Sequence, residues 1–194
     1  MQDIVLPKNN EKEFIEVAEK LGYAELCFLY PIEEFSLTSK QTSLQPKQTF
    51  ETKLKISYGI FCSSSQIQKA KQLAKFVVVK ADENQRRIIE SSPSMITDLE
   101  YISVRDSFHY RNSGLNQVLC GLAAKNNVSI GFNFNSVLNA QQSDRNLILG
   151  RMKQNIKFCQ KYKVRMVMAS FARSPYEMRN YNDMISLFRT MGLR

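Results

Sequence analysis

Short apolar runs alternate along the chain with segments in which apolar residues recur every three or four positions. The first pattern is typical of strands buried on both faces, and the second is typical of amphipathic helices. Strands are predicted at residues 3–7, 24–30, 54–62, 76–79, 94–96, 128–134 and 164–170. Helices are predicted at residues 11–21, 66–74, 83–90, 114–125, 143–163 and 180–191. The chain therefore repeats a strand–helix unit along its length.

The predicted helix over residues 114–125 has the clearest pattern. Its apolar residues fall at positions i, i+3, i+4 and i+7, which lie on one face of a helix: Leu115, Val118, Leu119 and Leu122. Asn112 or Ser113 is expected to cap it. Residues 31–52 instead read as a long polar excursion, within which one helical turn is an open alternative. Residues 97–110 read as irregular.

Seven strands separated by helices predict a largely parallel sheet, because neighbouring parallel strands need crossover connections. We expect one α/β domain over residues 1–194, with the polar excursion at 31–52 as an insertion. A small TIM-like β/α barrel of about seven parallel strands is favoured over an open, doubly wound sheet, although the pattern fits both. An eight-stranded barrel takes about 250 residues, so this one is expected to be small.

The composition is that of a globular chain, with 43% apolar and 23% charged residues. No window holds the roughly 18 apolar residues that cross a bilayer, and the first residues lack the pattern of a secretory signal. We therefore expect a cytoplasmic protein without a membrane partner. The cysteines are far apart in the chain, which favours buried, reduced thiols over a metal site or disulfides: Cys27, Cys62, Cys120 and Cys159.

The net charge of +9 is distributed unevenly along the chain. Residues 1–110 hold 14 Lys and Arg and 15 Asp and Glu, a net charge of −1. Residues 111–194 hold 13 Lys and Arg but only three acidic residues, a net charge of +10. A generally basic surface would be the simplest interpretation. The near absence of acidic residues in this part favours a polyanionic partner instead, with nucleic acid ahead of an anionic membrane.

Few residues of the chain are suited to catalysis. His109 is the only histidine, which excludes a cluster of histidines around a metal ion, and a structural or surface role is favoured for it. The seven glycines form no phosphate-binding loop motif. We expect neither a metal nor a cofactor on this chain.

An enzymatic alternative rests on three carboxylates after the fifth predicted strand, Asp98, Glu100 and Asp106. Loops that follow the strands of a β/α barrel form its usual active site. There the carboxylates could hold a divalent metal ion or transfer protons, as in a metal-dependent phosphoesterase. A solvated loop is the simpler interpretation.

The long helix carries a row of lysines at four-residue spacing, Lys153, Lys157 and Lys161. This spacing places them on one face. The opposite stripe is apolar: Ile148, Met152, Ile156 and Cys159. A lysine row is usually only a solvated face, but here the helix offers a single acid, Asp144, at its start. Lysines without carboxylate partners repel one another, and phosphates would neutralise them.

A second basic group is predicted on loops that follow strands. Arg105, Arg111 and Asn112 come after the fifth strand. Arg173 and Arg179 come after the seventh, close to Tyr176 and Tyr181 in the sequence. Arginines beside aromatic residues suit phosphate contacts combined with base stacking. Packing within the loop is an equally good interpretation of the tyrosines.

Residues 111–132 read RNSGLNQVLCGLAAKNNVSIGF, an Arg-x-x-Gly opening followed by a leucine-rich helix, a basic turn and an apolar strand. This segment resembles the thirty-kilodalton protein subunit of ribonuclease P, called protein component 3 in archaea. Residues 161–193 also resemble that family: a basic strand ending in Ser, an arginine-containing loop, and a helix that begins near an Asp. The resemblance is specific over residues 105–193, whereas over 1–100 only the strand–helix rhythm agrees.

The resemblance implies a barrel related to the PHP phosphoesterases but without their metal-binding histidines. It implies a non-catalytic subunit that binds the ribonuclease P RNA, which cleaves precursor tRNA with its own Mg²⁺. Precursor tRNA, a small α/β protein subunit and other ribonuclease P proteins are implied as partners. The RNA contacts that the resemblance implies are Arg111, Lys125, Arg173 and Arg179. An archaeal host is favoured; a eukaryotic member would be nuclear or nucleolar.

Three features depart from the family pattern. The family often has His where this chain has Gln117, and Pro where it has Ser136. Many members also continue with a further strand and helix beyond the position of Arg194. The barrel is therefore expected to be incomplete or open at its C-terminal end.

Overall fold

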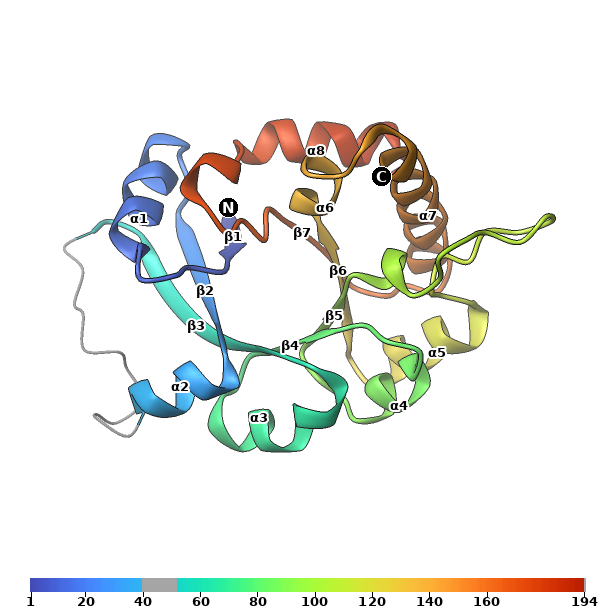
Figure 1. Cartoon of the computed structure of the whole chain (residues 1–194), viewed down its shortest axis with the longest axis horizontal. Helices are drawn as coiled ribbons and strands as arrows, with labels where there is room; N and C mark the ends of the chain where they lie inside the picture. The colour runs from blue at the N-terminus through green and yellow to red at the C-terminus, as the bar shows by residue number, and fades with distance from the viewer. Residues whose placement is uncertain (40–51, 194) are drawn as a thin grey trace.

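The computed structural model describes residues 1–39 and 52–193, and these form one curved sheet surrounded by helices (Figure 1). The strands are β1 (Gln2–Val5), β2 (Glu25–Pro31), β3 (Lys55–Cys62), β4 (Val77–Lys80), β5 (Met95–Thr97), β6 (Ser129–Asn133) and β7 (Met166–Ala169). They pair in sequence order, and every pair is parallel. The prediction of about seven parallel strands in a small β/α barrel is confirmed.

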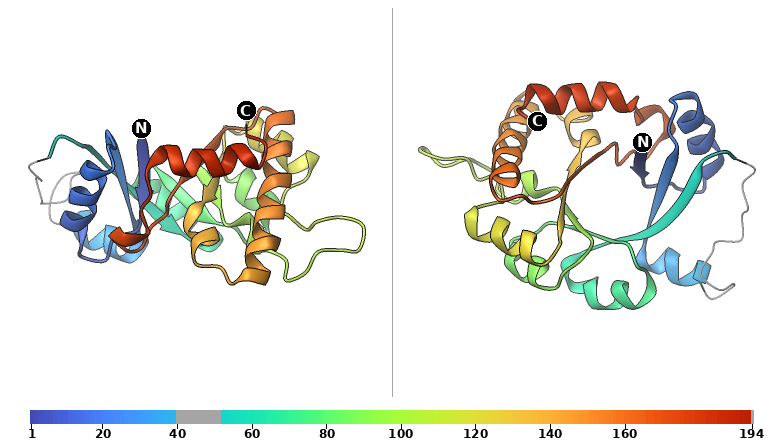
Figure 2. Two further views of the ribbon diagram at one scale, coloured as in Figure 1. Left: turned by 90° about the horizontal axis from the view of Figure 1, so that it is seen from above. Right: turned by 180° about the vertical axis from the view of Figure 1, so that it is seen from behind.

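The helices lie outside the sheet (Figures 1 and 2). They are α1 (Glu11–Lys20), α2 (Ile32–Ser39), α3 (Ile67–Leu73), α4 (Gln85–Glu90), α5 (Gln117–Lys125), α6 (Phe134–Leu138), α7 (Gln142–Lys161) and α8 (Tyr181–Thr190). Three short 3₁₀ turns, η1 (Ser64–Gln66), η2 (Leu99–Tyr101) and η3 (Pro175–Glu177), complete the connections. None of the helices within residues 1–39 and 52–193 has the length and the apolar composition of a membrane-spanning segment.

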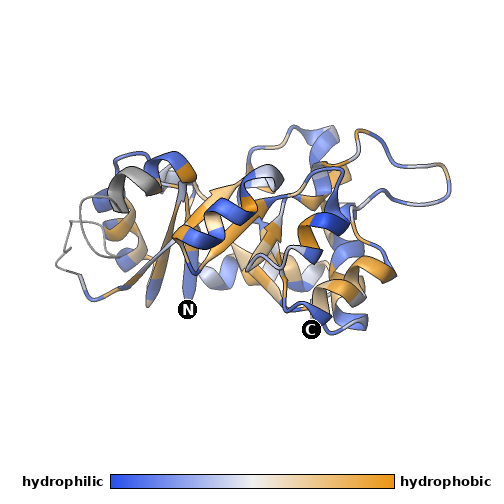
Figure 3. Cartoon of the chain, turned by 90° about the horizontal axis from the view of Figure 1, so that it is seen from below, coloured by the Kyte–Doolittle hydropathy of each residue, from blue (hydrophilic) through white to orange (hydrophobic). Residues whose placement is uncertain are grey.

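Consecutive strand residues are buried on opposite faces of the sheet. In β2, Leu26 and Phe28 belong to the cluster that packs with α1, whereas Cys27 belongs to the cluster that includes Val78 and Met95. Burial on both faces explains why the strands read as continuous apolar runs. Figure 3 shows hydrophobic residues concentrated along the strands. The four cysteines are buried and free, as predicted.

The barrel is nearly closed, and its seam lies between β1 and the segment that follows β7. One isolated bridge joins Val5 to Ala172, with a 2.8 Å hydrogen bond from Leu6 N to Ala172 O. The buried carboxylate of Asp3 accepts hydrogen bonds from Ser170 N at 2.7 Å and Ser170 Oγ at 2.6 Å. A second backbone bond runs from Phe171 N to Ile4 O at 2.8 Å. Two backbone bonds and the side-chain bonds of Asp3 thus stand where a full strand ladder would be, and the prediction of a barrel open at its C-terminal end is confirmed in this limited form.

Several helix boundaries differ from the prediction. The helix expected from residue 114 begins at Gln117, because Gly114 has a φ of +83°, outside the right-handed helical region. Its cap is therefore Asn116, whose side chain accepts a hydrogen bond from Leu119 N at 2.9 Å, and neither Asn112 nor Ser113 has this role.

Two helices were not predicted as such. Residues 31–52 were expected to form a polar excursion, but α2 occupies Ile32–Ser39; residues 40–51 lie outside the described part of the chain. The helix α6 has only five residues, too few to show a helical period. The side chain of Asn133 caps α6 by accepting a hydrogen bond from Ser136 N.

Candidate nucleic-acid interface

The predicted basic residues fall in separate places around the carboxyl side of the sheet and the outer helices. Arg105 and Arg111 are exposed on the loop between η2 and α5, which projects from the body of the molecule (Figures 1 and 2). Lys153, Lys157 and Lys161 are exposed along α7. The structure therefore places these five residues on two elements, the loop and α7.

The helix α7 has the two faces that its pattern predicted. Ile148, Met152 and Ile156 are buried against the rest of the molecule, whereas the three lysines are exposed. The ion pairs in the described ranges involve Lys55, Arg86 and Arg151, so none of them neutralises this lysine row. The row is therefore available to an anionic partner.

The end of the loop crosses α7 and brings Arg111 to two of these lysines. Arg111, Gly150, Lys153, Gln154 and Lys157 line a surface hollow of about 310 Å³. Gln154 Nε2 donates hydrogen bonds to Arg111 O at 3.2 Å and to Ser113 Oγ at 3.1 Å, which fixes the loop to the helix. Three cations from segments some 40 residues apart thus surround one small hollow.

Gly150 makes the approach of Arg111 possible. A Cβ atom at position 150 would lie 1.6 Å from Arg111 Nη1, so the guanidinium group occupies the space that any other side chain would need. Sequence analysis did not select Gly150 or Gln154. The sequence did contain a signal for Gly150. A glycine inside a helix destabilises that helix by roughly 0.5–1 kcal/mol relative to alanine. Such a glycine therefore often marks a place where another group packs closely against the backbone.

Arg151 anchors the base of the projecting loop from the buried side of α7. Its side chain is 1% exposed. Its Nε donates to Asp106 Oδ1 at 2.8 Å, and its Nη1 donates to Glu100 O at 2.7 Å and to Ser103 O at 2.6 Å. Partial burial acts to raise the pKa of Asp106, but the hydrogen bond from Arg151 and the backbone bond from Asn112 hold it below its ordinary value.

Asn112 braces the same loop. Its backbone N–H donates to Asp106 Oδ1 at 2.9 Å, and its side-chain amide donates to Arg105 O at 2.8 Å. The side-chain amide predicted to contact RNA therefore donates within the loop and links the outgoing and returning segments of the loop. The structure thus gives Asn112 a role in the shape of the loop.

Glu100 and Asn155 form the second buried link between η2 and α7. Asn155 Nδ2 donates to Glu100 Oε1 at 3.3 Å and to Ser113 O at 2.7 Å. Burial raises the pKa of Glu100 to about 7. Arg151 and Asn155 were not predicted from the sequence, although both are polar residues on the predicted apolar side of a helix, where a buried partner is expected.

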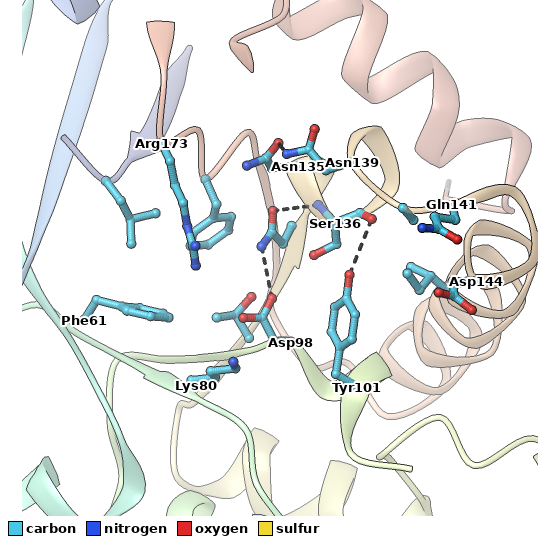
Figure 4. Close-up of a pocket in the computed structure, with 16 residues that line it drawn as sticks. Phe61, Lys80, Asp98, Tyr101, Asn135, Ser136, Asn139, Gln141, Asp144 and Arg173 are labelled. Atoms are coloured by element: carbon cyan, nitrogen blue, oxygen red, sulfur yellow. Dashed lines mark hydrogen bonds between the residues drawn. The ribbon is translucent and has the colours of Figure 1, made fainter. Parts of the chain in front are cut away.

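The remaining predicted cations lie elsewhere. Arg173 lines a cavity of about 510 Å³ at the carboxyl ends of the strands, together with Lys80, Asp98 and Tyr101 (Figure 4). Burial raises the pKa of Asp98, against a hydrogen bond from Asn133 Nδ2 at 3.0 Å and the nearby charges of Lys80 and Arg173. Arg173 thus belongs to the mouth of the barrel and lines a different cavity from that of Arg111.

Lys125 and Arg179 join neither group. Lys125 is exposed at the end of α5, just before β6 begins, and so lies toward the amino ends of the strands. Arg179 is partly buried, and its Nη1 donates to the carbonyl oxygens of Tyr176 and Met178, each at 2.8 Å. The predicted RNA contacts therefore do not form one continuous site.

The three carboxylates of the enzymatic alternative face different surroundings. Asp98 lines the barrel mouth, Glu100 points at α7, and Asp106 pairs with Arg151. Across residues 1–39 and 52–193, no group of three His, Cys, Asp or Glu side chains is arranged to hold a metal ion. The proximity on which a shared metal site depends is therefore not found for these three.

Comparisons with known proteins agree with this architecture. Ribonuclease P protein component 3 of Methanosarcina acetivorans is 39% identical over 83 residues, which cover 43% of this chain and 35% of that protein. The component 3 of Methanothermobacter thermautotrophicus is 25% identical over 186 residues, 91% of this chain and 73% of that protein. The matched segment thus spans about a third of the first of these relatives.

A solved structure has the same fold. A chain in the cryo-EM structure of archaeal ribonuclease P with mature tRNA superposes with a TM-score of 0.72 at 18% identity, over 98% of this chain and 83% of that chain. The sequence profile of the family described as RNase P subunit p30 matches residues 3–194. Because this match covers nearly the whole chain, the protein belongs to the RNase P subunit p30 family.

Proposed function

We propose that this chain is a non-catalytic subunit of ribonuclease P that binds the ribonuclease P RNA and assists it in the 5′ maturation of precursor tRNA. The observation that carries the proposal is the hollow on α7, which is lined by Arg111, Lys153 and Lys157; none of the three forms an ion pair with a residue in the described part of the chain. Membership of the family supplies the identity of the RNA.

The electrostatics of the hollow favour a phosphate group as its ligand. Three cations held around one hollow repel one another, and this repulsion is relieved when an anion enters between them. A phosphate group of RNA would do so with release of the counterions that surround it. Arg111 offers a planar set of donors, whereas the two lysines act as mobile point charges.

The proposal includes partners beyond the RNA. The relatives are named as components of ribonuclease P, and the similar chain comes from a structure of that complex with mature tRNA. We infer that precursor tRNA, the small α/β subunit and other ribonuclease P proteins meet this chain in the cytoplasm of an archaeal cell. The Mg²⁺ ions needed for cleavage are assigned to the RNA.

Salt dependence of RNA binding tests the role of the hollow. The variant R111A/K153A/K157A should bind the ribonuclease P RNA of the same organism more weakly than the wild type. The slope of log K against log salt should become shallower by about 2–3, because each phosphate contact contributes about 0.9 to it. Fluorescence titration over a series of salt concentrations measures both quantities, and cleavage of precursor tRNA in the presence of the small subunit gives the functional effect.

A matched variant separates the hollow from general charge. Lys8, Lys12 and Lys20 are exposed on and before α1, and their joint replacement by alanine removes the same charge. This control should keep most of the salt slope and of the stimulation of cleavage. Equal losses in the two variants would show that net charge, and not the hollow, drives binding; a wild-type chain without salt dependence would refute the phosphate contacts altogether.

A further inference from the structure

The tip of the projecting loop exposes large apolar side chains. Phe108 is 100% exposed, and Tyr110 is 66% exposed. Figure 2 shows this loop standing away from the helices and strands of the body. Side chains of this kind gain stability by burial, so their display at the end of a loop points to a binding partner.

Hydrogen bonds hold the segments of the loop that flank these side chains. Arg151 holds its base through Asp106, Glu100 O and Ser103 O. Within the loop, Asn112 donates to Arg105 O. A surface that is ordered before binding loses less conformational entropy when the partner arrives.

The charge around the tip identifies the kind of partner. Arg105 and Arg111 are exposed on either side of the aromatic residues, and the acid between them, Asp106, is paired with Arg151. The rings of Phe108 and His109 lie edge to face, with centroids 5.6 Å apart and planes at 72°. Aromatic rings between two cations match a ligand that has flat apolar faces and negative charge, as unpaired nucleotides have.

We propose that Phe108 stacks on an unpaired base of RNA, with His109 and Tyr110 beside it, while Arg105 and Arg111 contact the flanking phosphates. This inference rests on the proposed function and specifies the part of the RNA that the loop recognises, a single-stranded segment. Arg111 belongs both to the loop and to the hollow on α7, so one strand of RNA could continue from the tip to the helix.

The test compares two RNA probes, a single-stranded oligoadenylate containing 2-aminopurine and the duplex that it forms with oligouridylate. F108A should weaken binding of the single strand about tenfold and reduce the stacking-dependent change in 2-aminopurine fluorescence, because one stacked base is worth roughly 1–3 kcal/mol. Binding of the duplex should change less than about twofold, since its bases are already stacked. F108W should retain single-strand binding, and F108L should behave like F108A.

Val104 provides the matched control, because it is an exposed apolar side chain on the same loop without an aromatic face. V104A should bind both probes like the wild type. If F108A matches the wild type on the single strand, stacking is refuted while the salt-dependent binding through α7 stands. If F108A instead loses only the small protein subunit in a pull-down of the reconstituted complex, the loop contacts protein and the inference is wrong. A wild-type chain that binds neither probe nor ribonuclease P RNA would overturn both proposals.

Discussion

Gly150 shows how an absent side chain can position another side chain, here the exposed cation Arg111. The guanidinium group of Arg111 lies where a Cβ atom of residue 150 would be, on the helix surface that also carries Lys153. A glycine in a helix loses more conformational entropy on folding than other residues do. Here that residue stands where the loop packs against the helix backbone. We infer that Gly150 acts on the proposed phosphate site through Arg111 and does not itself contact the phosphate.

The substitution G150A tests this positioning role. The neighbour that must move is the far end of a flexible side chain, so the fold should tolerate the change, and the free energy of unfolding should rise by up to about 1 kcal/mol through helix propensity. RNA binding should weaken about fivefold, as expected for one lost phosphate contact near physiological salt. Urea unfolding and RNA titration measure the two effects separately.

Gly121 supplies the control for this prediction. It lies in α5, and apart from the adjacent residues and the nearby backbone of that helix, no atom lies within 4 Å of a Cβ atom built there. G121A should show the gain in stability without the loss in RNA affinity. In an R111A background, G150A should have no further effect on binding; an additional loss there would mean that position 150 acts on the RNA by another route.

For single residues, the sequence predicted which charged side chains share a helix face but not which residues of other elements lie beside them. The spacing of Lys153 and Lys157 follows from helix geometry and is visible in any window of the chain. Their contact with Arg111 depends on the path of a loop anchored by the buried Arg151, and no local pattern encodes that path. The basic site was therefore predictable as a face of one helix but not as a hollow between two elements.

Among the elements, η2 and α7 are joined by a buried carboxylate. Glu100 is fully buried against Asn155, and its pKa is raised from 4.5 to about 7 because burial disfavours the charged form. A carboxyl group with a raised pKa binds its proton more tightly in the folded state. Its contribution to stability is therefore present at low pH and is lost as the pH rises toward about 7.

We expect the free energy of unfolding to fall between about pH 4.5 and pH 7 and to level off above it. The variant E100Q should flatten this fall by up to about 3 kcal/mol, since one pKa unit corresponds to about 1.4 kcal/mol. Asp3, whose pKa burial raises to about 6, should leave a residual slope below that pH. Chemical denaturation at a series of pH values measures the curve, and an unchanged slope in E100Q would exclude Glu100 as its source.

Element boundaries were predictable wherever a period or a run was long enough to show. All seven strands and the long α7 were anticipated, because burial on both sides of a sheet and on one side of a helix leaves clear patterns. The start of α5 was misplaced because the left-handed conformation of Gly114 is a property of the loop that precedes the helix. The five residues of α6 are too few for any period to be detected.

For the molecule as a whole, the barrel depends on a seam that contains few backbone bonds. Val5 and Ala172 form an isolated bridge there, Phe171 N donates to Ile4 O at 2.8 Å, and Ser170 adds a side-chain bond to Asp3. The sequence predicted a barrel of about seven strands but not how its ends meet, because residues 3 and 170 are far apart in the chain. Asp3 and Ser170 each lie in an ordinary strand pattern and carry no local signal of their pairing.

Removing the hydroxyl group of Ser170 tests how much this seam contributes to the stability of the whole barrel. In S170A the buried Asp3 carboxyl group loses its 2.6 Å hydrogen bond to Ser170 Oγ, while the bond from Ser170 N remains. The free energy of unfolding should fall by about 1–3 kcal/mol, the usual effect of leaving a buried acceptor with one partner fewer. S186A, at an exposed serine of α8, should change it by less than about 0.5 kcal/mol. Hydrogen exchange should accelerate in β1 and at residues 170–172 in S170A, because the barrel can open at the seam without breaking a strand ladder. Equal protection of these amides in both variants would mean that the helices, and not the seam, hold the barrel closed.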